Sequence, residues 1–286
     1  MNGLNEKNCD FKKGEEFKME RVLILGASGL VGKALLKELN KKYDVYGTYS
    51  SNKIDSINSI YYDISKVYEI ADILNNVKPT KIVYCLRGDF DTQIELLNEI
   101  VKYLLPISGK LYFCSTGNVF DGDPTKAHLK NHEPIAESDY GKFKIECEKI
   151  LRKGLNDNGI ILRLPMIWGK DSPRLNSILT TLKANEKVDV YTNLYLNNNT
   201  DEMLAKQISY IIENDLKGIF HLGSSEVINH YEFIKNIITN LGYKDAKFNE
   251  ETLPGEKYYL AVLPTVGELP EELNFSNEYV INQITS

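Results

Sequence analysis

Several features are scarce in this sequence of 286 residues, and each scarcity excludes a class of protein. No apolar run approaches the length of about 18 residues that crosses a bilayer, so a membrane-spanning protein is not expected. The N-terminus lacks the apolar segment of a secretory signal. Lys and Arg form no cluster and the formal net charge is −6, so nucleic acid is not an expected partner either.

Cysteine and histidine are also rare, with four residues of each. The cysteines form no CxxC pair, and Cys85 and Cys114 stand in apolar runs typical of buried strands. We therefore expect free thiols and a reducing, cytoplasmic location. His128 and His132 are four residues apart, but their segment is polar and non-periodic, so no metal site is predicted.

Residues 1–18 are polar and show no periodicity, which predicts a disordered extension. Lys13-Gly14-Glu15 can be encoded by a purine-rich stretch that resembles a bacterial ribosome-binding site, and Met19 follows at about the usual spacing. We therefore also consider the hypothesis that translation starts at Met19. Mass spectrometry of native protein that begins upstream of Met19 would contradict it.

What the sequence does contain is an alternation of short apolar runs with helical periodicity, which indicates parallel βαβ units. Strands are predicted at 21–25, 43–49, 59–62, 81–85, 110–114, 159–164 and 219–222, and helices at 30–39, 71–77, 92–105, 140–151, 175–182, 202–213 and 230–241. The predicted fold is α/β, a Rossmann-type doubly wound parallel sheet with a smaller C-terminal substrate lobe. Residues 19–165 would form the dinucleotide-binding core, and residues 166–286 would return a strand and helices to it and build the lobe.

A glycine-rich turn follows the first predicted strand directly and opens a helix. Its sequence is Gly26-Ala-Ser-Gly29-Leu-Val-Gly32. Gly26 allows the tight turn, Gly29 lets the backbone approach a pyrophosphate, and Gly32 lets the helix pack closely on the strand. The free N–H groups at the helix N-terminus suit phosphates, so a nicotinamide dinucleotide is the predicted ligand.

The end of the second predicted strand favours NADP(H), although NAD(H) is not excluded. NAD-specific sites usually place Asp or Glu here for the ribose 2′-hydroxyl, and no acid occurs before Asp55. Ser50, Ser51 and Lys53 suit a 2′-phosphate better. Asp63, after the third strand, either accepts from the adenine amino group or caps the segment that follows.

Together, four segments resemble the extended short-chain dehydrogenase/reductase family, and most of all the dTDP-4-dehydrorhamnose reductases. They are the glycine turn, Cys114-Ser-Thr-Gly-Asn-Val-Phe-Asp-Gly122, Tyr140-Gly-Lys-Phe-Lys144 and Leu162-Arg-Leu-Pro-Met-Ile-Trp-Gly169. The similarity extends from about residue 20 to residue 235.

The resemblance implies the catalytic residues Thr116, Tyr140 and Lys144. In the family the tyrosine donates a proton to the substrate carbonyl, the threonine position hydrogen-bonds the same oxygen, and the lysine holds the nicotinamide ribose. Tyr140 and Lys144 would share one helix face. We expect the ammonium to lower the phenol pKa from about 10 toward 7, which requires roughly 4 kcal/mol. The alternative for Thr116 is a hydroxyl that caps its own backbone.

The resemblance also suggests contacts with the ligands. Arg87 could reach cofactor phosphates or a substrate diphosphate, or be a surface cation. Gly117 stands where these reductases usually have Asp, and the absence of an acidic pair after Thr116 argues against a dehydratase. The expected substrate contacts are Asn118 and Phe120. The expected cofactor contacts are Gly26, Ser28, Gly29, Leu30, Val31, Gly32, Ser50, Ser51, Lys53, Asp63, Ile64, Cys85, Leu86, Arg87, Tyr140, Lys144 and Pro165.

The function implied is an NADP(H)-dependent reductase of a 4-keto nucleotide-diphospho-sugar in surface polysaccharide synthesis. A nucleotide-sugar is the expected partner, and a homodimer is possible. Two alternatives stay open: an epimerase of the same family that uses the same three residues, and a non-catalytic NADP-binding regulatory subunit.

Overall fold

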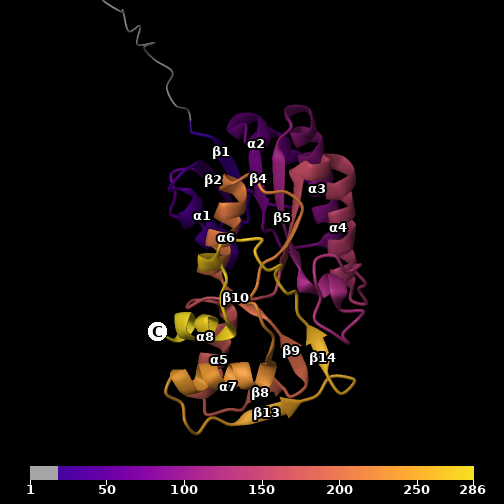
Figure 1. The fold of residues 1–286 in the computed structure, drawn as a ribbon. Helices are drawn as coiled ribbons and strands as arrows, with labels where there is room; N and C mark the ends of the chain where they lie inside the picture. Colours follow the sequence, from indigo (N-terminus) through magenta and orange to yellow (C-terminus); the bar gives the residue numbers. More distant parts are fainter. Residues whose placement is uncertain (1–18) are drawn as a thin grey trace, which may run out of the picture.

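A parallel sheet of seven strands forms the centre of the protein, in a computed structural model that describes residues 19–286 (Figure 1). The strand order is β11-β6-β5-β4-β1-β2-β3, and every neighbouring pair is parallel. The strands are β1 (Arg21–Leu25), β2 (Asp44–Tyr49), β3 (Ser59–Tyr61), β4 (Lys81–Tyr84), β5 (Lys110–Thr116), β6 (Gly159–Leu164) and β11 (Ile219–His221). The expectation for residues 1–18 lies outside the described residues.

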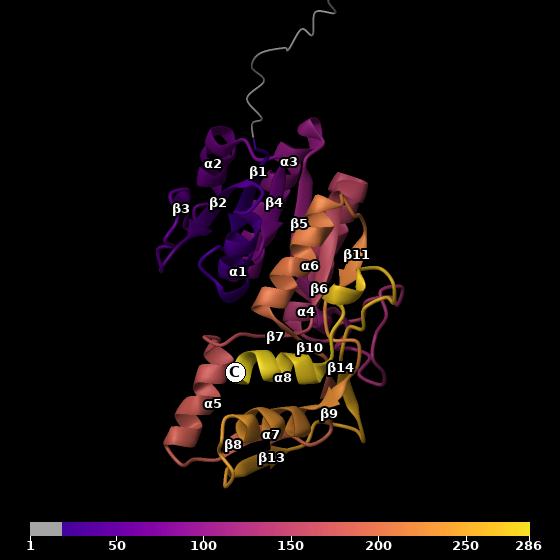
Figure 2. The same cartoon turned by 60° about the vertical axis from the view of Figure 1, so that its left-hand side comes forward.

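Helices cover both faces of this sheet, so the predicted doubly wound α/β fold is confirmed (Figure 2). One face carries α1 (Leu30–Leu39) and α6 (Asp201–Glu213), and the other carries α2 (Ile70–Val77), α3 (Phe90–Leu104) and α4 (Asp139–Leu155). Along β1, Val22 and Ile24 face the first core, while Leu23 and Leu25 face the second. All four are fully buried, as expected for a strand covered on both sides.

After β6 the chain builds a second group of elements beside the carboxyl ends of the central strands (Figures 1 and 2). It contains the helices α5 (Pro173–Lys183), α7 (His230–Asn240) and α8 (Asn277–Thr285). Its strands are β7 (Met166–Trp168), β8 (Val188–Tyr191), β9 (Leu194–Leu196), β10 (Asn198–Thr200), β12 (Ile228–Asn229), β13 (Phe248–Glu251) and β14 (Tyr258–Leu260). They pair as β10-β7, β12-β9-β14 and β13-β8. The division at residue 165 into two domains remains our proposal.

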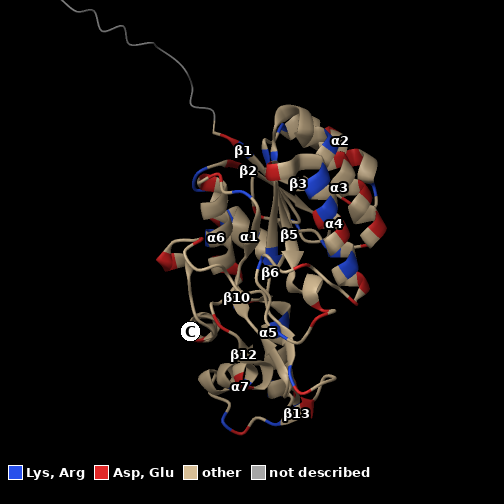
Figure 3. Ribbon diagram, turned by 45° about the vertical axis from the view of Figure 1, so that its right-hand side comes forward, with Lys and Arg blue, Asp and Glu red and all other residues tan. Residues whose placement is uncertain are grey.

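Short 3-10 helices complete the described chain at Val67–Glu69 (η1), Leu105–Ile107 (η2), Gly117–Phe120 (η3), Asn156–Asn158 (η4) and Glu271–Leu273 (η5). Charged residues of both signs are interspersed along α2, α3 and α4 (Figure 3). Within residues 19–286, no helix combines the length and the apolar character that crossing a membrane requires.

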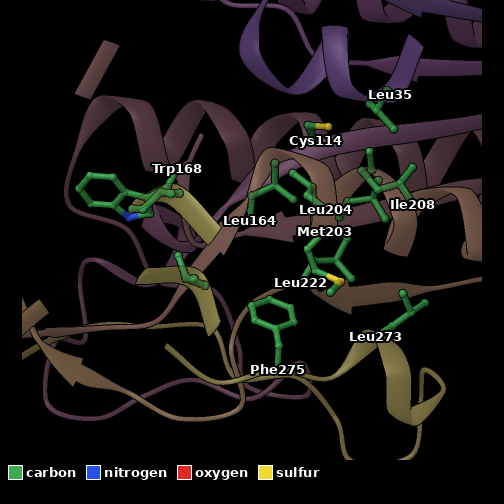
Figure 4. Packing of buried hydrophobic residues seen from close by; sticks show 14 of the residues in the cluster. Leu35, Cys114, Leu164, Trp168, Met203, Leu204, Ile208, Leu222, Leu273 and Phe275 are labelled. Atoms are coloured by element: carbon green, nitrogen blue, oxygen red, sulfur yellow. The ribbon is translucent and has the colours of Figure 1, made fainter. Parts of the chain in front are cut away.

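Apolar packing is continuous from the sheet into the second group of elements. Trp168 and Leu164 pack in one cluster with Met203 of α6 and Phe275 near the C-terminus (Figure 4). The Trp168 side chain is fully buried. The two parts of the chain therefore share one hydrophobic core on this face of the sheet.

Buried asparagines lie at the junction between the central sheet and the second group of elements. Asn198 accepts a hydrogen bond from the Trp168 indole at 2.9 Å and donates to Asn277 at 2.8 Å. Asn197 donates to the carbonyl oxygens of Ser224 and Val262. This Asn-rich stretch follows β9, and its amides are occupied by the protein's own polar groups, so it holds the junction together.

Candidate active site

The glycine turn after β1 has the close contacts that its sequence predicts. Gly26 has φ +85°, a conformation that residues with a side chain rarely adopt. Its N–H donates to the Thr48 hydroxyl at 2.9 Å, which ties the turn to β2. A Cβ on Gly32 would come within 2.2 Å of the Gly26 carbonyl oxygen, so only glycine fits there.

Gly29 differs from the other two glycines of the turn because the space beside it is open. A Cβ on Gly29 would meet only the Gly26 carbonyl oxygen, at 3.4 Å. Gly29 is also the N-cap of α1. It has no side chain to accept from the helix N–H groups, and the first turn contains no acidic residue. The turn therefore presents a free helix N-terminus and room for a close ligand, which fits a dinucleotide pyrophosphate.

The segments that follow β2 and β3 carry the residues expected at the adenosine end. Ser50, Ser51 and Lys53 are all exposed in the loop after β2. Asp63 accepts hydrogen bonds from the backbone and the hydroxyl of Ser65, at 3.0 and 2.8 Å, and these bonds lower the pKa of its carboxyl. The structure thus shows Asp63 organising its own turn, and contact with adenine stays a proposal.

The chain after β4 passes directly against the glycine turn. The Cys85 carbonyl oxygen would be 3.0 Å from a Cβ on Gly26, and a Leu86 methyl group would be 3.3 Å away. An Ile64 methyl group would be 3.7 Å from a Cβ on Gly88. Arg87 is exposed and forms no ion pair with any carboxylate of residues 19–286.

Two thiols meet where β4 and β5 end. The Cys85 and Cys114 sulfur atoms are 3.3 Å apart, and both thiols are free. The hydrogen bond with Cys114, together with burial, raises the pKa of the Cys85 thiol. Pro165 lies beyond β6, where its ring would be 2.9 Å from a Cβ on Gly223.

Thr116, Tyr140 and Lys144 are brought together by β5 and α4. Thr116 is the last residue of β5, and the other two lie in the first turns of α4. The Lys144 ammonium lies 5.9 Å from the centre of the Tyr140 ring and donates to the Cys114 carbonyl oxygen at 2.9 Å. Tyr140 keeps 39% of its surface exposed, whereas Lys144 is 3% exposed. The phenol can therefore meet a ligand, whereas the ammonium is buried beside it.

The expected lowering of the Tyr140 pKa is wrong for this structure. Burial raises the pKa of the Tyr140 phenol, and the nearby Arg87 charge and Thr116 hydroxyl only partly oppose that rise. Burial also lowers the pKa of the Lys144 ammonium. Sequence spacing gave the shared helix face but not the cost of desolvating both groups.

Thr116 shows the capping role that the sequence analysis gave as the alternative, and its contact with a substrate oxygen stays a proposal. Its hydroxyl accepts a hydrogen bond from the Asn118 backbone N–H at 3.3 Å, as a cap of η3. It also donates to the Asn118 side-chain oxygen at 3.1 Å, and it is close enough to Tyr140 to lower the phenol pKa.

A cavity of about 420 Å³ opens beside these groups. It is lined by Asn118, Asp121, Glu137, Ser138, Tyr258 and Leu260. Asn118 thus lines a cavity, and its contact with a substrate stays a proposal.

Phe120 is a correction to the expected substrate contacts. It is 2% exposed, its ring stacks on His128 with 4.2 Å between centres, and the Arg163 guanidinium lies 4.9 Å from it. Its apolar ring is therefore part of the packing beneath the cavity.

Of the six residues that line this cavity, only Asn118 was predicted from the sequence, and three of the other five show what the sequence can and cannot reveal. Ser138 had a usable signal, because Ser before a helical segment is a typical N-cap and here caps α4. Asp121 stands in the quoted motif, but only the structure shows what its carboxylate binds. Tyr258 comes from β14, about 120 residues further along the chain than Tyr140, and no local pattern indicates that contact.

A protein-family model covers the elements that carry Thr116, Tyr140 and Lys144. The family model of the RmlD substrate binding domain matches residues 93–257, more than half of the chain and a range that includes the three residues at the end of β5 and on α4.

Two curated relatives are similar at low identity. A dTDP-4-keto-6-deoxy-D-glucose reductase of Streptomyces niveus is 23% identical over 239 residues, covering 78% of this chain and 79% of the relative. The methionine adenosyltransferase 2 subunit beta of Xenopus tropicalis is 25% identical over 235 residues, covering 74% and 69%.

Among solved structures, a dTDP-4-dehydrorhamnose reductase of Bacillus anthracis in complex with NADP superposes with a TM-score of 0.75. It is 21% identical, and the match covers 93% of this chain and 98% of that one. The chain therefore belongs to the family of the RmlD substrate binding domain, within the extended short-chain dehydrogenases/reductases.

Proposed function

We propose that the protein is an NADP(H)-dependent reductase of a 4-keto nucleotide-diphospho-sugar. The observation that carries the proposal is the meeting of Thr116, Tyr140 and Lys144 at one strand end, beside the polar cavity described above. The reductase activity named for the Streptomyces niveus relative supports the same reaction class. We further propose a cytoplasmic enzyme of surface polysaccharide synthesis, in keeping with its free thiols.

Tyr140 suits the role of proton donor. A phenol whose pKa is raised stays protonated at neutral pH, so it has a proton to give to a carbonyl oxygen that gains negative charge. The nicotinamide cofactor, when bound, supplies the hydride. The Thr116 hydroxyl is close enough to Tyr140 to bond the same oxygen and stabilise its charge.

Lys144 is the third residue of this arrangement, and the protein holds its ammonium in place. Its bond to the Cys114 carbonyl holds the ammonium under the strand end, leaving further N–H donors for the ribose hydroxyls of a cofactor. For the adenosine end, we propose that Ser50, Ser51 and Lys53 bind the 2′-phosphate, because they are exposed beside the turn and no acid stands among them. The remaining cofactor contacts expected from the sequence are part of the same proposal.

The experiment is a fluorescence titration with NADPH and NADH, repeated with a panel of dTDP- and UDP-linked 4-keto sugars. Binding of NADPH in preference to NADH, followed by its consumption with one of the sugars, would support the proposal. Failure to bind either dinucleotide would overturn it.

A non-catalytic regulatory subunit is the second candidate, because one relative is named as the beta subunit of a methionine adenosyltransferase. That role predicts NADPH binding without consumption across the panel. An epimerase of the same family would instead interconvert sugar nucleotides without net consumption of the dinucleotide, which product analysis of the same reactions would reveal.

A further inference from the structure

Asp121, directly after η3, is a buried carboxylate that four donors surround. It is 8% exposed, and it forms no ion pair within residues 19–286. One oxygen accepts from the backbone N–H groups of Glu137 and Ser138, at 2.7 and 3.2 Å. The other accepts from the Ser138 hydroxyl and, at 3.4 Å, from the Asn118 amide. Because all four partners donate, only an acceptor without protons satisfies them together.

On one side, these bonds fix the beginning of α4. Ser138 is the N-cap of this helix, and its hydroxyl accepts from the Gly141 N–H at 3.0 Å while it donates to Asp121. Tyr140 lies between the two residues joined by that cap. Any displacement of the cap therefore moves the backbone that carries the phenol.

On the other side, Asp121 is linked to Thr116 through one side chain. The Asn118 amide donates to Asp121, and its oxygen accepts from the Thr116 hydroxyl at 3.1 Å. The helix and this turn are also in close contact, since a Cβ on Gly141 would come within 2.3 Å of the Asn118 carbonyl oxygen. Asp121 is thus connected both to the Thr116 hydroxyl and to the start of the helix that carries the Tyr140 phenol. These are the two groups that would bind the same substrate carbonyl oxygen.

We propose that Asp121 is the positioning residue that sets the Tyr140 phenol against the Thr116 hydroxyl. The proposal rests on the reductase function proposed above. Asp121 lines the cavity, but its oxygens are already occupied by Asn118, Glu137 and Ser138, so it acts through these partners and not as a contact for the sugar.

The test is Asp121→Asn, which keeps the shape of the side chain and turns one acceptor into a donor. We expect kcat to fall at least about tenfold, with the Kd for NADPH unchanged within about twofold, because the glycine turn is not touched. The matched control is Ser276→Ala, which removes the N-cap of α8, where the serine accepts from the Tyr279 N–H at 3.2 Å. It should lower Tm to a similar extent and leave kcat unchanged.

A second readout needs no turnover. In protein with ¹³C-labelled tyrosine rings, the Tyr140 signal, assigned by its absence in Tyr140→Phe, is followed as pH rises. Asp121→Asn should shift the Tyr140 titration, because the Thr116 hydroxyl and the start of the helix that carries the phenol are no longer held in place, and Ser276→Ala should not. Wild-type kcat and an unmoved Tyr140 titration in Asp121→Asn would overturn the proposal. If wild-type protein shows no turnover but Asp121→Asn still shifts the Tyr140 titration, only the proposed reductase function is refuted.

Discussion

The Lys144 ammonium donates a hydrogen bond to the Cys114 carbonyl oxygen at 2.9 Å, and so joins α4 to the strand that ends in Thr116. The aromatic rings of Phe113 and Phe143 lie 4.4 and 5.4 Å from the same ammonium. Burial lowers the pKa of the Lys144 ammonium, and the nearby Cys147, Cys114, Cys85 and Glu148 only partly oppose that shift. The two rings stabilise the ammonium by cation–π contact. The lysine therefore has a fixed place in the protein itself, and the predictions below test the structure around it.

Substitutions at Gly29 and Gly32 should distinguish an effect on ligand binding from an effect on stability. Gly29→Ala should change the free energy of unfolding by less than about 0.5 kcal/mol, because a methyl group meets only one atom at 3.4 Å. It should weaken dinucleotide binding at least about tenfold, since the methyl group occupies the space for the pyrophosphate. Isothermal titration and urea unfolding measure the two effects.

Gly32→Ala is the matched variant and should behave in the opposite way. The methyl group would lie 2.2 Å from the Gly26 carbonyl oxygen, so the backbone must shift, at a cost of about 1–3 kcal/mol in unfolding free energy. Gly29→Ala protein with wild-type affinity for NADPH would show that no pyrophosphate approaches this turn.

The Glu148–Arg163 pair should couple strongly. Arg163 is fully buried, its guanidinium donates to both carboxylate oxygens of Glu148, at 3.1 and 2.8 Å, and the Ser115 hydroxyl donates to one of them. Glu148→Leu or Arg163→Met alone leaves a buried charge unpaired and should cost about 3–5 kcal/mol. The double variant should lose less stability than the sum of the two single losses. The difference should be about 1 kcal/mol or more, as is typical of residues in contact. Additive losses in urea unfolding would show that the charges do not interact.

Asn198→Ala should destabilise the junction by about 2–4 kcal/mol, because the Trp168 indole and the Asn277 side chain each lose a buried hydrogen-bond partner. Trp168 is the one tryptophan of the sequence, so its fluorescence reports the change at that site. The exposed Asn176, whose amide only donates to the Asp171 backbone, provides the control Asn176→Ala. Equal stability of both variants would refute the role assigned to the buried amides.

Acid should destabilise the protein before its carboxylates titrate. Burial, together with Arg163, lowers the pKa of His221 to about 3, and burial, together with Arg174, lowers that of His230 to about 4. The unfolded chain binds these protons below its histidine pKa of about 6.5, so stability is complete above that pH and falls as pH drops toward 4. Each histidine contributes a slope of about 1.4 kcal/mol per pH unit.

The variant His230→Asn isolates one of these contributions. Asparagine offers an oxygen near the ring nitrogen that accepts from the Tyr191 N–H at 3.1 Å, but it does not titrate. Urea unfolding between pH 6 and 4.5 should show the slope reduced by about 1.4 kcal/mol per unit. An unchanged slope would mean that His230 is not buried in its neutral form.

The sequence predicted the central sheet closely because each strand is a short apolar run beside a turn signal. The predicted strand at 159–164 coincides with β6, and the predicted helix at 230–241 differs from α7 by one residue. The helix at 140–151 was too short, because Ser138 and Asp139 begin α4 and polar residues extend it to Leu155.

The small sheets of the second part were largely missed. Their strands have two to four residues, too few for a periodic pattern, and β14 reaches its partner β9 across more than 60 residues of chain. The candidate site follows the same rule. Tyr140 and Lys144 are neighbours on one helix and could be paired from spacing, whereas Asp121 and Tyr258 acquire their positions only through tertiary contacts.

Tyr140→Phe tests the central claim most directly, with NADPH consumption and NADPH binding measured on the same protein. The account predicts that wild-type protein consumes NADPH with a 4-keto sugar nucleotide, and that the variant binds NADPH within about twofold of wild type but loses about 100-fold or more in kcat. Turnover that survives in Tyr140→Phe would show that the phenol does not donate the proton, and would contradict the mechanism proposed for this site.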